Sequence, residues 1–90
     1  MFKNWNAIGY LFVIMDQRIK LIAKKIKSLR VEKGYISSEF FAWEHKIPRV
    51  QYWRMEKGTN FTIKNLLRIL DAHQLSLEEF FKDIEKSDPH

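Results

Sequence analysis

The sequence predicts an all-α domain, a bundle of five helices, and three observations lead to this fold class. Hydrophobic residues make up 46% of the 90 residues, with only two prolines and three glycines, which argues against disorder and against short strands joined by turns. Apolar residues recur at steps of three and four along most of the chain. Residues suited to capping helices stand at the ends of these stretches. A chain of this length holds one core, and because it has no cysteine, packing alone must stabilise it.

The N-terminal segment lacks the helical periodicity. Residues 7–15 form an apolar run that is too short to span a membrane and has no cluster of positive charges before it, as a signal peptide would. Its β-branched and aromatic residues favour a short strand, although its length also allows a helix. Alternatively, translation starts at Met15 and residues 1–14 are not natural protein. The expected organisation is an extension over 1–15 that acts as a strand or dimerisation arm, a folded domain over 16–86 and a polar tail over 87–90.

The first helix is expected between Asp16, which can cap its start, and Gly34, which can end it. Its predicted inner face consists of Ile19, Ile22, Ala23, Ile26 and Leu29, and its outer face of Lys20, Lys24, Lys27 and Arg30.

Two shorter helices follow, over residues 37–45 and 48–56. Ser37 or Ser38 can cap the first of them. Pro48 suits the first turn of the second, because its missing N–H has no partner to lose there, and the helix should end near Gly58.

The last two helices each begin with a capping residue. Thr62 precedes a stripe of Ile63, Leu66, Leu67 and Leu70, which should fade near residues 73–74. Ser76 and Glu79 have the spacing of a capping box. The inner face of the last helix is expected to contain Leu77, Phe80, Phe81 and Ile84.

The second and third helices, separated by about three residues, form the architecture of a helix-turn-helix. Residues 37–58 resemble the helix-turn-helix of the Cro and lambda-repressor (XRE) family, and the resemblance extends over about 19–85. It implies a lambda-repressor-like domain that binds double-stranded DNA as a small bacterial or phage transcription regulator, with helix 48–56 in the major groove. The protein would then act in the cytoplasm, as a repressor or other regulator.

The matching residues also have physical roles of their own. Ala42 is small, as a close crossing of the two motif helices requires, and the core beneath the crossing is expected to contain Phe41, Ile47, Tyr52 and Met55. Two residues depart from the family pattern. Ser38 stands where most members have glutamine, and Lys46 stands where they have glycine in the turn.

The resemblance assigns two sets of DNA contacts. Base contacts are expected from Arg49, Val50, Gln51, Trp53 and Arg54, since arginine pairs with guanine and valine can meet a thymine methyl group. Trp53 could instead make an aromatic contact with Trp43. Phosphate contacts are expected from Ser38, Lys46, Lys57, Thr59, Asn60 and Lys64.

The charge distribution agrees with a polyanionic partner. Of the formal net charge of +5, residues 16–34 carry seven basic and two acidic side chains, whereas residues 76–90 carry two basic and five acidic ones. A basic helix face is, however, often plain solvated surface.

Other functions are less well supported. The three histidines have no metal-ligand spacing, and there is no phosphate-binding loop or paired-carboxylate motif, so the sequence predicts no enzyme, metal, cofactor or small-molecule ligand. The alternative is a helical interaction module, antitoxin-like or an adaptor, that kept the fold without specific DNA binding. A homodimer is expected, with contacts from Tyr10, Phe12, Phe80, Phe81 and Ile84.

Overall fold

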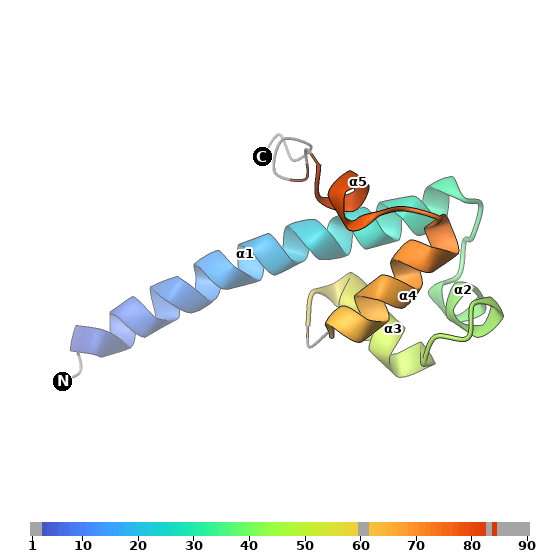
Figure 1. Ribbon diagram of the computed structural model, residues 1–90. Coiled ribbons are helices and arrows are strands. Elements are labelled where there is room, and N and C mark those ends of the chain that lie inside the picture. Colours follow the sequence, from blue (N-terminus) through green and yellow to red (C-terminus); the bar gives the residue numbers. More distant parts are fainter. Residues whose placement is uncertain (1–2, 60–61, 83, 85–90) are drawn as a thin grey trace.

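The computed structural model describes residues 3–59, 62–82 and 84, with residues 3–16 described by their backbone alone. The described residues form five helices and no strand, which confirms the all-α class. The helices are α1 (Lys3–Glu32), α2 (Ser38–Glu44), α3 (Arg49–Lys57), α4 (Ile63–His73) and α5 (Leu77–Phe81). Short connections join them, and α2 to α5 gather around the C-terminal half of α1 (Figure 1).

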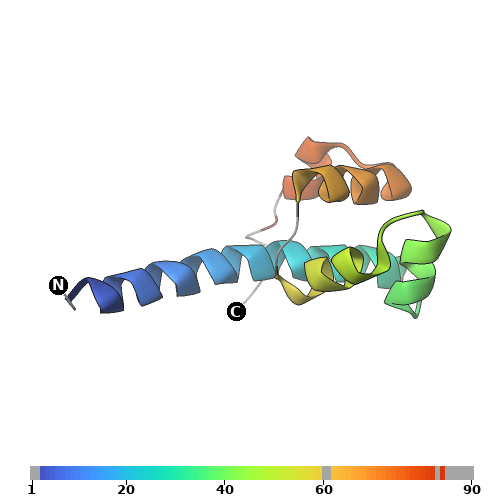
Figure 2. The ribbon, with the colours of Figure 1, turned by 90° about the horizontal axis from the view of Figure 1, so that it is seen from below.

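The N-terminal half of α1 projects away from the other helices in both ribbon views (Figures 1 and 2). The predicted strand within residues 7–15 is therefore wrong, and Asp16 lies inside a helix instead of capping it. A helix satisfies its own backbone hydrogen bonds, whereas a lone strand needs a partner strand, so β-branched residues alone do not determine the structure here. Despite its 30 residues, α1 has no stretch apolar enough to cross a bilayer among those described.

One core lies where α1 to α5 meet. It contains Ala42, expected at the helix crossing, and the four residues expected beneath it, Phe41, Ile47, Tyr52 and Met55, together with Ile26, Leu66, Ile69, Leu70 and Phe80. Phe41 is fully buried, and its ring contacts residues from three directions: Tyr35 before α2, Tyr52 on α3 and His73 at the end of α4. These contacts place α2 and α3 at a fixed angle on the rest of the domain.

The face that α4 buries differs from the predicted one. Ile63 and Leu67 are 64% and 41% exposed, and Asn65 and Ile69 face inward in their place. Leu66 and Leu70 are buried as predicted, so only one edge of the stripe was wrong, because Asn65 is polar and its buried position depends on a hydrogen bond to α3.

The face of α5 was also predicted only in part. Phe80 is buried, but Leu77 and Phe81 are 49% and 40% exposed, because α5 ends at Phe81 and presents only one side to the core.

The helix boundaries follow the predicted caps. Ser37 accepts a hydrogen bond from the backbone N–H of Phe40 at 3.2 Å, and Thr62 accepts one from that of Asn65 at 3.1 Å. Ser76 and Glu79 form both halves of the capping box, at 3.1 and 2.9 Å, and these bonds lower the pKa of Glu79. Side chains close in sequence thus bind the free backbone N–H groups at the N-terminal end of each of these helices.

His73 gives the fold a dependence on pH. Its ring stacks on Phe41 with centroids 5.2 Å apart, and its Nε2 is buried without a hydrogen bond to any described residue. Burial, followed by the charge of Lys33 and by His45, lowers the pKa of His73 to about 4. An unfolded histidine binds its proton near pH 6.5, so the unfolded state takes up this proton first and stability should fall as the pH drops from about 6.5 toward 4.

We expect His73→Phe, which keeps an aromatic ring against Phe41, to lose this part of the pH dependence. The measurement is urea unfolding of wild type and variant at pH 7.5 and pH 5. An equal change in the free energy of unfolding for the two proteins would contradict the role of His73.

Candidate nucleic-acid interface

The helices α2 and α3 form a helix-turn-helix, and the turn between them is the strained part of the motif. Lys46 has a φ of 59°, the left-handed conformation that favours glycine. The backbone N–H of Ile47 still bonds the carbonyl of Ala42 at 2.8 Å, so the turn keeps its hydrogen bonding. The lysine side chain is exposed next to the start of α3.

Relief of this strain should be measurable. Lys46→Gly and Lys46→Ala both remove the ammonium group, but only glycine adopts φ near 60° without a clash of its Cβ. We expect the glycine variant to be more stable than the alanine variant by about 0.5–1 kcal/mol, since the gain is reduced by the greater freedom of glycine in the unfolded chain. Equal stability of the two variants in urea unfolding would show that the turn carries no such strain.

The helix α3 has one buried side and one exposed side. Tyr52 and Met55 are buried in the core, and burial raises the pKa of the Tyr52 hydroxyl far above its usual range, so it stays neutral. The outer side consists of the exposed residues Arg49, Val50, Trp53, Arg54 and Lys57, which we call the reading face. Four of the five predicted base-contact residues thus lie on one exposed surface. The fifth, Gln51, lies at its edge.

Gln51 has a second role that the sequence did not indicate. Its side-chain oxygen accepts a hydrogen bond from the amide of Asn65, a residue only 6% exposed on α4. This bond connects the side of α3 to α4 and restricts the orientation of the Gln51 amide. The signal available in the sequence was Asn65 itself, a polar residue between apolar neighbours in α4.

The two arginines of the reading face differ in their surroundings. Arg49 lies 3.5 Å from Glu39 on α2, in an ion pair whose side chains are both about two-thirds exposed. Two other glutamates of α2 and α3, Glu44 and Glu56, are bound instead to Tyr35 and Arg30. Arg54 makes no ion pair with any residue that the structure describes.

The aromatic contact considered between Trp43 and Trp53 does not form. Lys57 places its ammonium 5.5 Å from the centre of the Trp53 ring, whereas Trp43 stacks on Phe40 with centroids 6.0 Å apart. Ile36, Phe40 and Trp43 are 95%, 52% and 74% exposed, and we call these three residues the apolar patch. An open groove beside Trp43 extends to Arg49, so this patch borders the start of the reading face.

Of the predicted phosphate contacts, Lys57 belongs to the reading face itself, and the others lie before or after α3 in the sequence. Ser38 is the first residue of α2 and is partly buried, whereas Lys46, Lys57, Thr59 and Lys64 are exposed. The hydroxyl of Thr59 donates a hydrogen bond to the carbonyl of Arg54 at 3.3 Å, which caps the C-terminal end of α3. Gly58 adopts the left-handed conformation expected there, with φ 79°. Asn60 lies outside the described residues.

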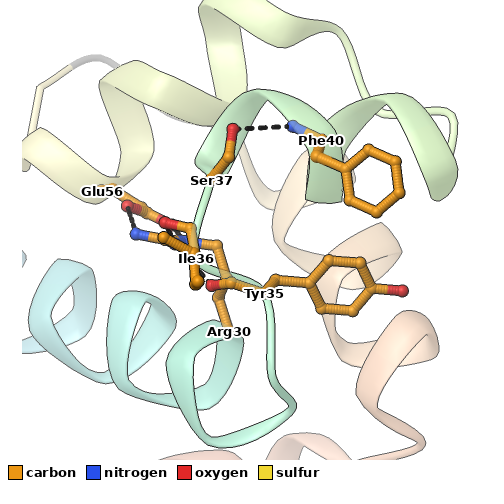
Figure 3. Close-up of polar contacts among 6 residues, drawn as sticks. All are labelled: Arg30, Tyr35, Ile36, Ser37, Phe40 and Glu56. Atoms are coloured by element: carbon orange, nitrogen blue, oxygen red, sulfur yellow. Dashed lines mark hydrogen bonds and ion pairs between the residues drawn. The ribbon is translucent and has the colours of Figure 1, made fainter.

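A buried ion pair positions α3 on α1. Arg30 is only 5% exposed, and its guanidinium bonds the two oxygens of Glu56 at 2.7 and 3.1 Å and the carbonyls of Tyr35 and Ile36 at 2.8 and 2.6 Å (Figure 3). The prediction that Arg30 faces solvent is therefore wrong. The signal was present in the sequence, because Arg30 follows the buried Ile26 by four residues and so shares its face. The hydrogen bond that Arg30 donates to Glu56 raises the pKa of Arg30 above its usual value.

The expected dimer contacts receive mixed support. Phe80 is fully buried in the core of its own chain, so its assignment to a dimer surface is wrong. Phe81 is 40% exposed and Ile84 is partly buried. Tyr10 and Phe12 lie on the projecting half of α1, and their side chains are outside the described residues.

No group of three or more histidine, aspartate or glutamate side chains that could hold a metal ion is found among the described residues. His45 is partly buried against Phe41, with ring centroids 4.4 Å apart.

Comparison with known proteins finds one similar regulator. No protein-family model and no solved structure matches the chain. A curated protein, "Control protein C.MunI" from Mycoplasma sp, is 40% identical over 63 residues, which cover 69% of this chain and 85% of that protein. The similarity therefore spans nearly all of a control protein and most of the helical domain. The chain belongs to the same family as this control protein, a family of helix-turn-helix regulators.

Proposed function

We propose that this regulator binds specific sequences in double-stranded DNA, with α3 in the major groove. The observation that carries the proposal is the reading face, on which two arginines and a lysine are exposed on one side of α3 while its other side is locked into the core. Arginine suits the bidentate recognition of guanine. Ser38, Lys46, Thr59 and Lys64 lie on the elements before and after α3, where they would contact phosphates and set its register.

The rigid attachment of α3 supports this proposal. A helix reads bases only if its angle on the rest of the domain is constant. The pair of Arg30 and Glu56 connects α3 to α1, and Gln51 connects it to α4. Glu56 and Gln51 lie on different sides of α3, so these two contacts together prevent rotation of the helix about its own axis.

Affinity for duplex DNA at several salt concentrations tests the proposal. Each phosphate that a lysine or arginine neutralises releases a counterion, so the logarithm of the binding constant should fall linearly with the logarithm of salt concentration, with a slope of about −0.9 for each such contact. The three lysines among the predicted phosphate contacts, Lys46, Lys57 and Lys64, predict a slope of roughly −3 per subunit. A binding constant that does not change with salt would contradict DNA binding through this surface.

A second function has one observation in its favour. The apolar patch of Ile36, Phe40 and Trp43 is exposed, as expected of a surface that binds another protein. An interaction module would use this patch and would bind DNA weakly and without a defined sequence. The same salt titration separates the two functions.

We also propose that the regulator is a homodimer that acts on DNA in the cytoplasm. One α3 reads few base pairs, and pairing two half-sites about one helical turn apart raises affinity. The projecting half of α1, with Tyr10 and Phe12, and the region of Phe81 and Ile84 are the proposed contacts. Sedimentation should show a weaker dimer for a chain that starts at Met15 than for the full chain. A full chain that is monomeric at high micromolar concentration would exclude this assembly.

A further inference from the structure

An apolar strip crosses the reading face between its cations. Val50 and Trp53 are 53% and 50% exposed, although both side chains are large and apolar. They are three residues apart on α3, so they are neighbours on the helix surface. At about 100° per residue, Val50 lies nearly opposite the midpoint between the buried Tyr52 and Met55. Val50 therefore points directly away from the core, with half of its side chain open to a ligand.

The surroundings of this strip determine what can cover it. Arg54 lies about 40° from Val50 around the helix, and the ammonium of Lys57 lies 5.5 Å from the centre of the Trp53 ring. An apolar protein surface over Val50 would bury these cations without partners, at a high energetic cost. A polyanion that also presents apolar groups would pair with the cations and cover the apolar strip at the same time. The major groove of DNA is such a surface, and its apolar group on the base edges is the methyl group at C5 of a pyrimidine.

We propose that Val50 and Trp53 recognise the 5-methyl group of a pyrimidine in the major groove. This inference rests on the proposed function, in which α3 enters that groove. Thymine and 5-methylcytosine both carry the methyl group at this position, and they differ in the hydrogen-bonding group beside it. Val50 has no hydrogen-bonding group, so its contact responds to the methyl group alone. Arg54, one turn further along α3, then reads a guanine close to the methylated base.

The experiment begins with selection of bound sequences from a random DNA pool by the full chain. Each thymine of the selected site is then replaced in turn by uracil, which removes only the methyl group and keeps every hydrogen-bonding group. We expect uracil to weaken binding about threefold to fivefold at one or two positions of each half-site, the size expected for one buried methyl group. These positions should lie next to the guanine whose preference is lost in Arg54→Ala. Elsewhere, uracil should have no effect.

Val50→Ala is the variant that assigns the effect to this residue. It should bind the thymine and uracil sites equally well at the sensitive position. Val31→Ala is the matched control, because Val31 is 54% exposed but lies on α1, away from α3. The control should keep the full preference for thymine. Circular dichroism of both variants should match the wild type, since both side chains are exposed.

A second set of sites, in which cytosine is replaced by 5-methylcytosine, tests whether the methyl group is recognised on either base. Where the selected site has cytosine beside the guanine read by Arg54, 5-methylcytosine should strengthen binding by the same factor, and Val50→Ala should remove the gain. A defined site with no response to uracil or to 5-methylcytosine would overturn the inference and leave the proposed function intact. A thymine preference that survives in Val50→Ala would also overturn it. If no sequence is enriched from the pool, the proposed function fails and the inference fails with it.

Discussion

Replacing Arg30 by alanine is expected to lower the free energy of unfolding by about 3–5 kcal/mol, a large share of the stability of a domain of this size. The loss has two causes. Glu56 would remain as a buried carboxylate without its partner, and the carbonyls of Tyr35 and Ile36 would lose their donor. Urea unfolding followed by circular dichroism measures the change.

The ion pair of Arg49 and Glu39 provides a matched control. It also joins an arginine to a glutamate on a neighbouring helix, but both side chains are about two-thirds exposed. Arg49→Ala should therefore change the free energy of unfolding by less than about 1 kcal/mol. A double variant, Arg30→Met with Glu56→Leu, should recover much of the stability, because it leaves no unpaired charge in the core. A loss below about 1 kcal/mol for Arg30→Ala would mean that this pair does not hold α3.

Replacing Phe41 by alanine is expected to cost about 3–5 kcal/mol, the usual range for a buried phenylalanine. Its ring contacts Tyr35, Tyr52 and His73 at centroid distances of 5.0, 5.2 and 5.2 Å, so the cavity would open between the elements that position α2 and α3. Unfolding in urea, or an unfolded far-ultraviolet spectrum at 25 °C, would show the loss.

Phe40 is the control for this variant, because it is the neighbouring residue of the same type and is 52% exposed. Phe40→Ala should lose less than about 1 kcal/mol. Similar losses for the two variants would contradict the packing of α2 described above.

Local sequence signals predicted most of the fold. Ser37, Thr62 and the pair of Ser76 and Glu79 begin helices where their capping chemistry places them, because a cap depends on residues only a few positions apart. The left-handed Gly58 was predictable for the same reason. The core beneath the crossing of α2 and α3 also followed from spacing, as Phe41 and Met55 show.

The failures come from interactions between distant residues. Residues 7–15 contain strand-forming types, but α1 continues through them, and nothing local to the run shows that the helix begins at Lys3. Arg30 is basic and lies in a basic helix, yet it is buried because Glu56, 26 residues later, pairs with it. Asn65 is buried by its bond to Gln51. The identity of each partner is known only once the helices are assembled, although the four-residue spacing from Ile26 already placed Arg30 on the buried face of α1.

The candidate site was predictable as a set of residues and not as an arrangement. The resemblance assigned Arg49, Val50 and Arg54 to one exposed face, and the structure places them there. It did not indicate that Gln51 is bonded to α4 or that Lys57 lies over Trp53. These contacts depend on side-chain geometry at the surface, where many conformations fit the same pattern of residues.

The base preference of Arg54→Ala tests most directly whether α3 reads DNA sequence. The measurement compares sites selected from a random pool, and their affinities, for wild type, Arg54→Ala and Lys57→Ala. Arg54→Ala should lose about 1–3 kcal/mol on the preferred site and its preference at one base position, with a much smaller change on unrelated DNA. Lys57→Ala should weaken all sequences alike and reduce the salt slope by about one. An unchanged selected sequence and affinity for Arg54→Ala would contradict the assignment of α3 as the reading helix.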